Sequence, residues 1–159
     1  MFFGMNKMTD VADDELKRAL IKKQSCFKLL TEQETAILAD LLIEKHYTAG
    51  ELIVKQGEPV DSVYLIVSGT ADVIHITRKE NSTETEFLAT LGPEEAIGLS
   101  ETGFYSLSGI RTANVTANTD MVLLRLSVAA FHGFALAYAH VNEVMRKFSE
   151  NIISNDQFE

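Results

Sequence analysis

The region between Tyr47 and Ser127 consists of short apolar segments separated by turn residues. Gly50, Gly57 and Gly69 mark several of these turns, because glycine readily takes positive φ. The polar stretch KENST is typical of a hairpin tip. So many short strands in one stretch predict a compact antiparallel jelly-roll barrel over about residues 45–126. The segments are rich in Val, Ile, Leu and Thr: ELIVKQG, SVYLIVSG, TADVIHIT, TEFLATLG, TANVTANT and MVLLRLS.

Helical patterns precede this β region. Carboxylates at Asp10, Asp13 and Asp14 come before apolar residues, which predicts one helix from about residue 10 to residue 30. Thr31 followed by Glu34 has the spacing of a capping box and indicates the start of a second helix. The expected buried stripe of that second helix is Ile37, Leu38, Leu41 and Leu42.

A third helical region follows Ser127, whose hydroxyl is expected to cap it. Gly133 is expected to divide or bend this region into two pieces. In the second piece four apolar residues recur at alternating spacings of four and three, which is typical of a narrow a/d-like seam: Val141, Met145, Phe148 and Ile152. The seam either packs on the chain's own barrel or forms a homodimer with a second copy.

The chain of 159 residues fits one domain with small helical attachments. We expect an N-terminal helical extension over residues 1–25, a main domain over 26–153 with C-terminal helices from about 127, and a tail over 154–159. The predicted fold class is mainly β with flanking helices: a double-stranded β-helix (jelly-roll) barrel between N-terminal and C-terminal helices.

Charge and cysteine content exclude several classes of protein. The formal net charge is −9, and no Lys and Arg cluster of the kind that grips nucleic acid is present. The single cysteine, Cys26, excludes an intramolecular disulfide and a cysteine-based metal cluster. No signal peptide or membrane-spanning apolar run is apparent. A cytoplasmic protein without membrane association is therefore expected.

Patterns typical of catalytic sites are also missing from the sequence. The four histidines, His46, His75, His132 and His140, include no His-x-His pair of the kind that holds a cupin metal. Ser68 lies in a turn of the barrel and lacks the strand-elbow-helix context of a hydrolase. There is no Walker A motif and no GxGxxG. We expect neither an enzyme nor a metal site.

The segment YTAGELIVKQGEPVDSVYLIVSGTADV, from Tyr47 to Val73, contains Gly-Glu-x-Ile, then Gln-Gly-Glu-Pro, then Tyr-x-Ile-x-x-Gly. With the order helix, barrel, helix, it resembles the cyclic-nucleotide-binding domain of catabolite activator proteins, protein kinase A regulatory subunits and cyclic-nucleotide-gated channels. The resemblance covers about Cys26 to Ile153. This segment reports fold more than ligand, because its glycines serve turns and its aliphatic residues serve the core.

The family's phosphate-binding cassette corresponds to IGLSETGFYSLSGIRTANVTA, from Ile97 to Ala117, which contains one arginine. A cyclic phosphate carries one negative charge, which a buried guanidinium and backbone N–H groups can neutralise. The resemblance implies that Arg111 pairs with the phosphate, that Thr112 adds its hydroxyl, and that Ala113 lets the backbone approach closely.

The carboxylate of the family's Phe-Gly-Glu motif is displaced in this sequence. Ile97 and Gly98 match the first two positions, but the third is Leu99, which cannot accept a hydrogen bond from a ribose hydroxyl. Counting back from the arginine instead, Leu99, Ser100 and Glu101 stand for the motif. We favour a mixed interpretation, with Gly98 in the family position, a lengthened cassette, and Glu101 as the sugar acceptor.

The resemblance implies a stand-alone regulatory domain that senses a cyclic nucleotide, with cyclic AMP expected in preference to cyclic GMP and no other cofactor. Bound phosphate is expected to order the cassette and reposition the C-terminal helix as a lid, so that Tyr138, Val141 or Met145 covers the base. The helix is then expected to signal to an unidentified protein partner. No winged helix-turn-helix follows it, so direct DNA binding is not expected.

A competing interpretation is a nucleotide-free interaction domain that keeps the barrel and binds another protein through its helices. Arg111 would then close a loop by capping carbonyls or by pairing with a surface carboxylate. The two interpretations differ in which residue stands at the family's carboxylate position, Leu99 or Glu101.

Overall fold

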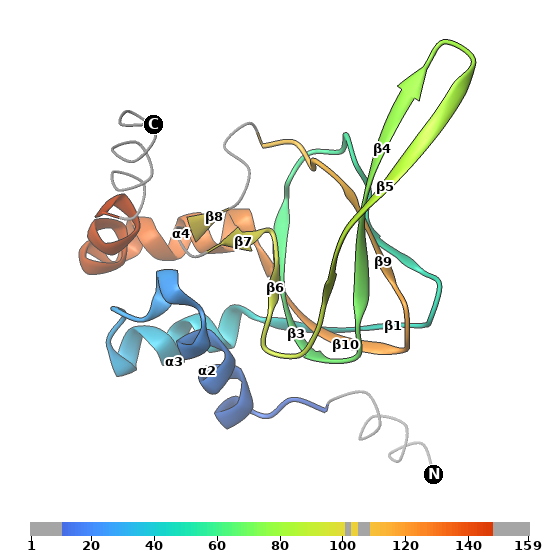
Figure 1. The fold of residues 1–159 in the computed structure, drawn as a ribbon. Coiled ribbons are helices and arrows are strands. Elements are labelled where there is room, and N and C mark those ends of the chain that lie inside the picture. The colour runs from blue at the N-terminus through green and yellow to red at the C-terminus, as the bar shows by residue number, and fades with distance from the viewer. Residues whose placement is uncertain (1–10, 101–102, 105–108, 148–159) are drawn as a thin grey trace.

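The computed structural model describes residues 11–100, 103–104 and 109–147, and it contains two antiparallel sheets with helices packed at one side of the barrel (Figure 1). One sheet has the order β1 (Ile43–Tyr47), β10 (Met121–Ser127), β3 (Ser62–Ser68), β6 (Ala96–Ile97). The other has the order β2 (Leu52–Val54), β9 (Asn114–Ala117), β4 (Ala71–Lys79), β5 (Ser82–Leu91). A short pair joins β7 (Leu99–Ser100) to β8 (Gly103–Phe104). This architecture confirms the predicted mainly-β class with flanking helices.

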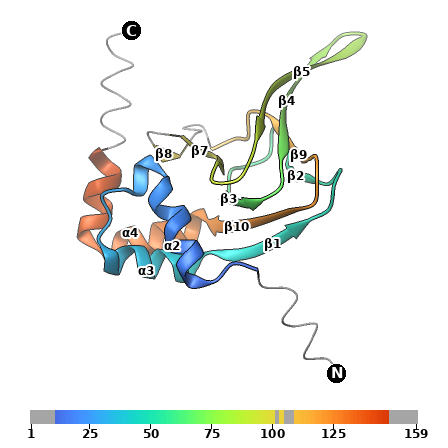
Figure 2. The ribbon, with the colours of Figure 1, turned by 60° about the horizontal axis from the view of Figure 1, so that its bottom comes forward.

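The helices lie before β1 and after β10, and they pack together beside the first sheet (Figure 2). They are α2 (Asp14–Lys23), the 3-10 helix η1 (Ser25–Phe27), α3 (Glu32–Leu41), α4 (Val128–Ala137) and a helical segment over residues 139–147. No helix in these described ranges is both long and apolar enough to cross a bilayer.

Two predicted helix caps are confirmed. The Thr31 hydroxyl accepts from the Glu34 N–H at 3.1 Å, and the Glu34 carboxylate accepts from the Thr31 N–H at 2.9 Å, which completes the capping box. The Ser127 hydroxyl accepts from the N–H of Ala130 at 2.9 Å. The polar stretch after Lys79 forms the turn of the β4–β5 hairpin, as expected from its composition.

Several boundaries differ from the prediction. The first helix is shorter than expected, because Asp13 caps it and Gln24 ends it, and η1 follows. The strand β1 begins directly after the second helix and was not predicted, since IEKHY shows neither apolar alternation nor a preceding turn signal. The C-terminal region breaks at Tyr138 and not at Gly133, because Gly133 is exposed and needs no special backbone conformation.

Strands β3 and β10 are buried on both faces and separate two hydrophobic cores. Val63 and Leu65 of β3, with Leu124 of β10, pack against the helices in what we call the helical core. Tyr64 and Ile66 of β3 pack between the sheets in the barrel core. The near-continuous apolar runs SVYLIVS and MVLLRLS follow from this two-sided burial.

Part of the C-terminal seam packs in the helical core. Val141 is fully buried in this core, and Met145 packs against it. This half of the seam therefore packs on the chain itself, while Phe148 and Ile152 lie outside the described residues. Cys26 is fully buried in the same core, and burial raises the pKa of its thiol to about 12.

The turn between β5 and β6 contains a strained residue. Glu94 has φ 75°, and it is the one non-glycine with positive φ in the described part of the chain. Its N–H donates to the Ile66 carbonyl at 3.0 Å, and its own carbonyl accepts from the Gln24 side chain at 3.0 Å. These two bonds hold the turn in a conformation that costs a side-chain-bearing residue about 1 kcal/mol.

We predict that Glu94→Gly raises the free energy of unfolding by about 1 kcal/mol, because glycine adopts positive φ without steric cost. Urea denaturation measures this change. The matched control is Glu95→Gly, which removes a carboxylate that accepts from the Gly92 N–H at 2.7 Å and should lower stability. Equal losses in both variants would contradict the assignment of strain to Glu94.

Candidate functional site

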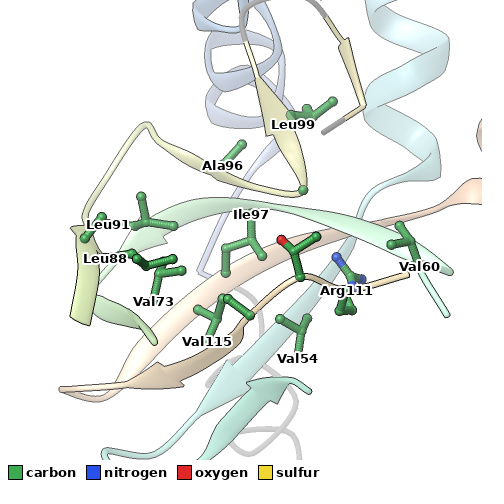
Figure 3. A pocket seen from close by; sticks show the side chains of 14 residues that line it. Val54, Val60, Val73, Leu88, Leu91, Ala96, Ile97, Leu99, Arg111 and Val115 are labelled. Carbon is green, nitrogen blue, oxygen red and sulfur yellow. The ribbon is translucent and has the colours of Figure 1, made fainter. Parts of the chain in front are cut away.

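A cavity of ≈ 380 Å³ lies inside the barrel, and we call it the Arg111 cavity (Figure 3). Its fourteen lining residues include two with polar side chains, Arg111 and Thr112. Arg111 lies at one end, and Val73, Leu88 and Leu91 lie at the other (Figure 3). The cavity is therefore polarised, with a cation at one end and an aliphatic wall opposite. The remaining lining residues are Val54, Val60, Ala89, Ala96, Ile97, Gly98, Leu99, Ala113 and Val115.

The backbone of Arg111 is fixed by the loop between β2 and β3. The Arg111 N–H donates to the Glu58 carbonyl at 2.8 Å, and the Arg111 carbonyl accepts from the Gly57 N–H at 2.8 Å. The Val60 N–H donates to the Gly109 carbonyl at 2.6 Å. These bonds extend the ladder beyond the sheets and set the position from which the arginine side chain enters the cavity.

The Arg111 side chain is buried, with 7% of its surface exposed. Its Nη2 donates to the Ser62 carbonyl at 2.6 Å and lies 3.4 Å from the Ser62 hydroxyl. The Asp61 carboxylate is 3.9 Å from Nη2, is largely exposed, and also approaches Arg125 at 3.5 Å. The close acceptors of the guanidinium among the described residues are thus neutral oxygens.

Burial is the main influence on the charge of Arg111. Desolvation lowers the pKa of its guanidinium, and Arg125 lowers it further, while Tyr64 and Asp61 act in the opposite direction. Arginine ordinarily titrates above pH ~12, so the group remains a cation at neutral pH. A desolvated cation in an apolar cavity is a strong attractor for an anion, because low dielectric strengthens their interaction.

Gly98 lies between β6 and β7, beside the guanidinium of Arg111. Its φ is 90°, and a Cβ at this position would lie 3.2 Å from Arg111 Nη1 and 3.1 Å from a Val63 methyl carbon. Both the backbone conformation and the close approach therefore require glycine here.

Five of the seven residues predicted to form a site line the Arg111 cavity: Gly98, Leu99, Arg111, Thr112 and Ala113. Leu99 also belongs to the helical core, where it is buried. Ser100 continues β7, and Glu101 lies outside the described residues. The structure therefore brings the arginine and the glycine together, and it shows Leu99 as an apolar lining residue of the same cavity.

The residues proposed as a lid do not line this cavity. Val141 is committed to the helical core, and Tyr138 lies on the surface between the two C-terminal helices. Met145 packs partly against the helical core. In this arrangement the C-terminal helix packs on the N-terminal helices, and His140 Nδ1 lies 2.8 Å from the Glu34 carboxylate.

The aliphatic wall was missed by sequence reasoning. Val73 pairs with Ala89 while Ile74 pairs with Phe87, so Leu88 is an extra residue in a β-bulge. This bulge allows the consecutive residues Leu88 and Ala89 both to line the cavity, which a regular strand with alternating side chains does not permit. No local pattern in TEFLATLG indicates the bulge, because it depends on the register with β4.

Comparisons with known proteins place these features in context. A family model described as the cyclic nucleotide-binding domain matches residues 44–138, which is more than half of the chain. Human cGMP-dependent protein kinase 2 is 23% identical over 158 residues, which cover 99% of this chain and 20% of the kinase. The chain thus spans about a fifth of the length of this relative.

Solved structures show the same fold. The N-terminal domain of a transcriptional regulator from Streptomyces coelicolor A3(2) has a TM-score of 0.72 at 22% identity and covers 86% of this chain and 94% of that one. The regulatory subunit of a cAMP-independent protein kinase A from Trypanosoma brucei has a TM-score of 0.63 at 21% identity, with 86% of this chain and 47% of that chain covered.

We predict that Gly98→Ala lowers the free energy of unfolding by about 2–3 kcal/mol, the sum of backbone strain and overpacking against Val63 and Arg111. Gly57→Ala is the matched control, because Gly57 has φ 92° but a Cβ added to it would meet no atom within 4 Å. In that control the free energy of unfolding should fall by only about 1 kcal/mol, because backbone strain is the single cost. Equal losses in urea denaturation would show that the contact with Arg111 is not tight.

Proposed function

Because the chain belongs to the cyclic nucleotide-binding domain family, we propose that it is a regulatory domain that binds a cyclic nucleotide in the Arg111 cavity. The observation that carries this proposal is the buried Arg111 guanidinium at one end of an otherwise apolar cavity. A cyclic nucleotide has the matching shape and charge, with an anionic phosphate at one end and a flat, weakly polar base at the other.

In this proposal the phosphate binds Arg111 in place of part of its contact with Ser62. Thr112 lines the cavity beside the arginine and supplies a hydroxyl donor, and Ala113 leaves room for the phosphate near the backbone. Gly98 allows the strand entering β7 to approach the guanidinium. Leu99 and Ser100 continue the cassette, and Glu101 supplies the acceptor for the ribose hydroxyl.

The base would lie against the aliphatic wall of Val73, Leu88 and Leu91. The described residues of this wall offer no side-chain hydrogen-bond partner. Guanine carries one more polar group on its edge than adenine, and a buried polar group without a partner costs free energy. We therefore propose that cyclic AMP is preferred over cyclic GMP.

The proposed output is regulatory and not catalytic. The relatives reported above are named as a protein kinase, a transcriptional regulator and a regulatory subunit, so a protein partner in the cytoplasm is proposed for this domain. We propose that the C-terminal helix carries the signal, by leaving its contacts with the helical core when ligand binds.

A second candidate function is a nucleotide-free interaction domain. The observation in its favour is that Leu99, which follows Gly98 where one alignment of the motif expects the carboxylate, is apolar and buried in the helical core. A domain that had lost nucleotide binding would keep Arg111 for its bond to the Ser62 carbonyl.

We predict that Arg111→Ala lowers cyclic AMP affinity at least about 100-fold, because removing one partner of a buried charge pair costs ~3 kcal/mol or more. Isothermal titration with cyclic AMP and cyclic GMP measures this loss. Arg125→Ala is the matched control, since Arg125 also approaches Asp61 but does not line the cavity, and its affinity should stay within about threefold of the wild type. The absence of binding by the wild-type protein would favour the interaction domain.

We also predict that Glu101→Ala weakens cyclic AMP binding about tenfold by removing the sugar acceptor, a loss of ~1.4 kcal/mol. The same substitution should leave the affinity for 2′-deoxy cyclic AMP unchanged, because that ligand lacks the hydroxyl. Titration of both proteins with both ligands completes a double-mutant cycle. Equal losses for the two ligands would remove Glu101 from the ribose contact without affecting the role of Arg111.

A further inference from the structure

The β4–β5 hairpin projects beyond the barrel as a two-stranded ribbon (Figure 1, Figure 2). The two strands pair from Ala71 and Leu91 out to Lys79 and Ser82, but β9 pairs with β4 only as far as Ile74. The outer part of the hairpin therefore has no third strand among the described residues. An isolated ribbon of this kind is only marginally stable in water, and its edges can receive another strand.

The β4 edge of the ribbon is closed by a side chain. The Ile76 N–H donates to Gln56 Oε1 at 2.8 Å, and Gln56 Nε2 donates to the Ile76 carbonyl at 2.9 Å. The Gln56 backbone N–H donates to the Asn114 side chain at 2.7 Å, which ties this amide to β9. Gln56 thus replaces the missing strand at the point where β9 ends.

The geometry of this closure determines which groups the β5 edge presents. In an antiparallel ladder two opposed residues either bond to each other or both point away. Ile76 is opposed to Thr85, and the backbone groups of Ile76 point toward Gln56. The N–H and C=O of Thr85 therefore point to the free edge, as do those of Thr83 and Phe87 two residues away on either side.

No described residue pairs with this edge, since β5 is the last strand of its sheet. One face of the ribbon is acidic, with Glu84 and Glu86 on β5 and Lys79 of β4 paired to Glu84 at 2.9 Å. The other face carries Phe87, which is 61% exposed. The edge thus combines free backbone groups, a negative face and an exposed aromatic ring.

A second copy of this chain does not suit the edge. Two β5 strands that are related by a two-fold axis pair antiparallel. Glu84 and Glu86 of both copies then lie on the same face of the joined sheet. In the registers centred on Glu84, Thr85 or Glu86, glutamates of the two copies lie opposite one another. Like charges directly opposed in a sheet are destabilising, so the charge pattern favours a partner of opposite sign.

We propose that the free edge of β5, over residues 82–87, receives an extended basic segment of a partner protein as an added strand. Backbone bonds would form at Thr83, Thr85 and Phe87. The segment would alternate Lys or Arg, facing Glu84 and Glu86, with apolar residues facing Phe87. This surface is separate from the Arg111 end of the cavity, and the proposal does not require that a nucleotide binds.

The probe is a labelled peptide, acetyl-TKVKVKT-amide, titrated at low salt by fluorescence anisotropy and followed by amide hydrogen exchange in NMR. We expect saturable binding with slowed exchange at the amides of Thr83, Thr85 and Phe87. The same peptide methylated on the backbone nitrogens of its valines should bind much more weakly, because these N–H groups would point to β5 when the lysines face Glu84 and Glu86. Replacing both Glu84 and Glu86 by Gln should weaken binding about fivefold.

Thr85→Pro removes an outward N–H without breaking a bond to β4, and it should abolish binding. Thr85→Val keeps that N–H and serves as the matched control, with binding retained. The proposal is overturned if the wild type does not bind the peptide, if the methylated peptide binds equally well, or if an acidic peptide with Glu for Lys binds equally well. Protection of the same three amides by self-association without peptide would assign the edge to a second copy and would also overturn it.

Discussion

The burial of β3 and β10 on both faces is the constraint on which the rest of this structure depends. Side chains that alternate along these strands enter the helical core and the barrel core in turn. Neither core can be exposed without removing the wall of the other, so helices and barrel are stabilised together. Ser62, at the start of β3, is fully buried, and its carbonyl holds the guanidinium of Arg111. The cation of the site is thus anchored to the central wall.

Features of the fold with a local physical cause could be read from the sequence. The capping box at Thr31 and the cap at Ser127 depend on residues three apart, and the turn glycines on φ alone. Strands of two residues such as β6 and β7 have no periodicity to detect, and β1 has little apolar alternation. The break at Tyr138 falls where the sequence has neither glycine nor proline, so no local pattern indicates it.

Part of the lining of the Arg111 cavity was also predictable from the sequence. Gly98 and Arg111 to Ala113 lie in two short segments that the resemblance to the family selects, and the fold brings both segments to one cavity. The wall at Leu88 was not predictable, because the bulge that turns it into the cavity arises from the register of two strands. The burial of Leu99 likewise depends on its packing in the helical core, which involves residues distant in the sequence. Long-range register and competition between cores are the information that a single sequence lacks.

The burial of Cys26 has a practical chemical consequence. Burial raises the pKa of this thiol, which keeps it protonated at neutral pH, and the sulfur is also shielded from reagents. Because the sequence contains no other cysteine, the native chain is nearly inert toward maleimides and disulfide reagents. A cysteine introduced at an exposed position such as Glu80 would therefore be labelled selectively, without first removing the natural one.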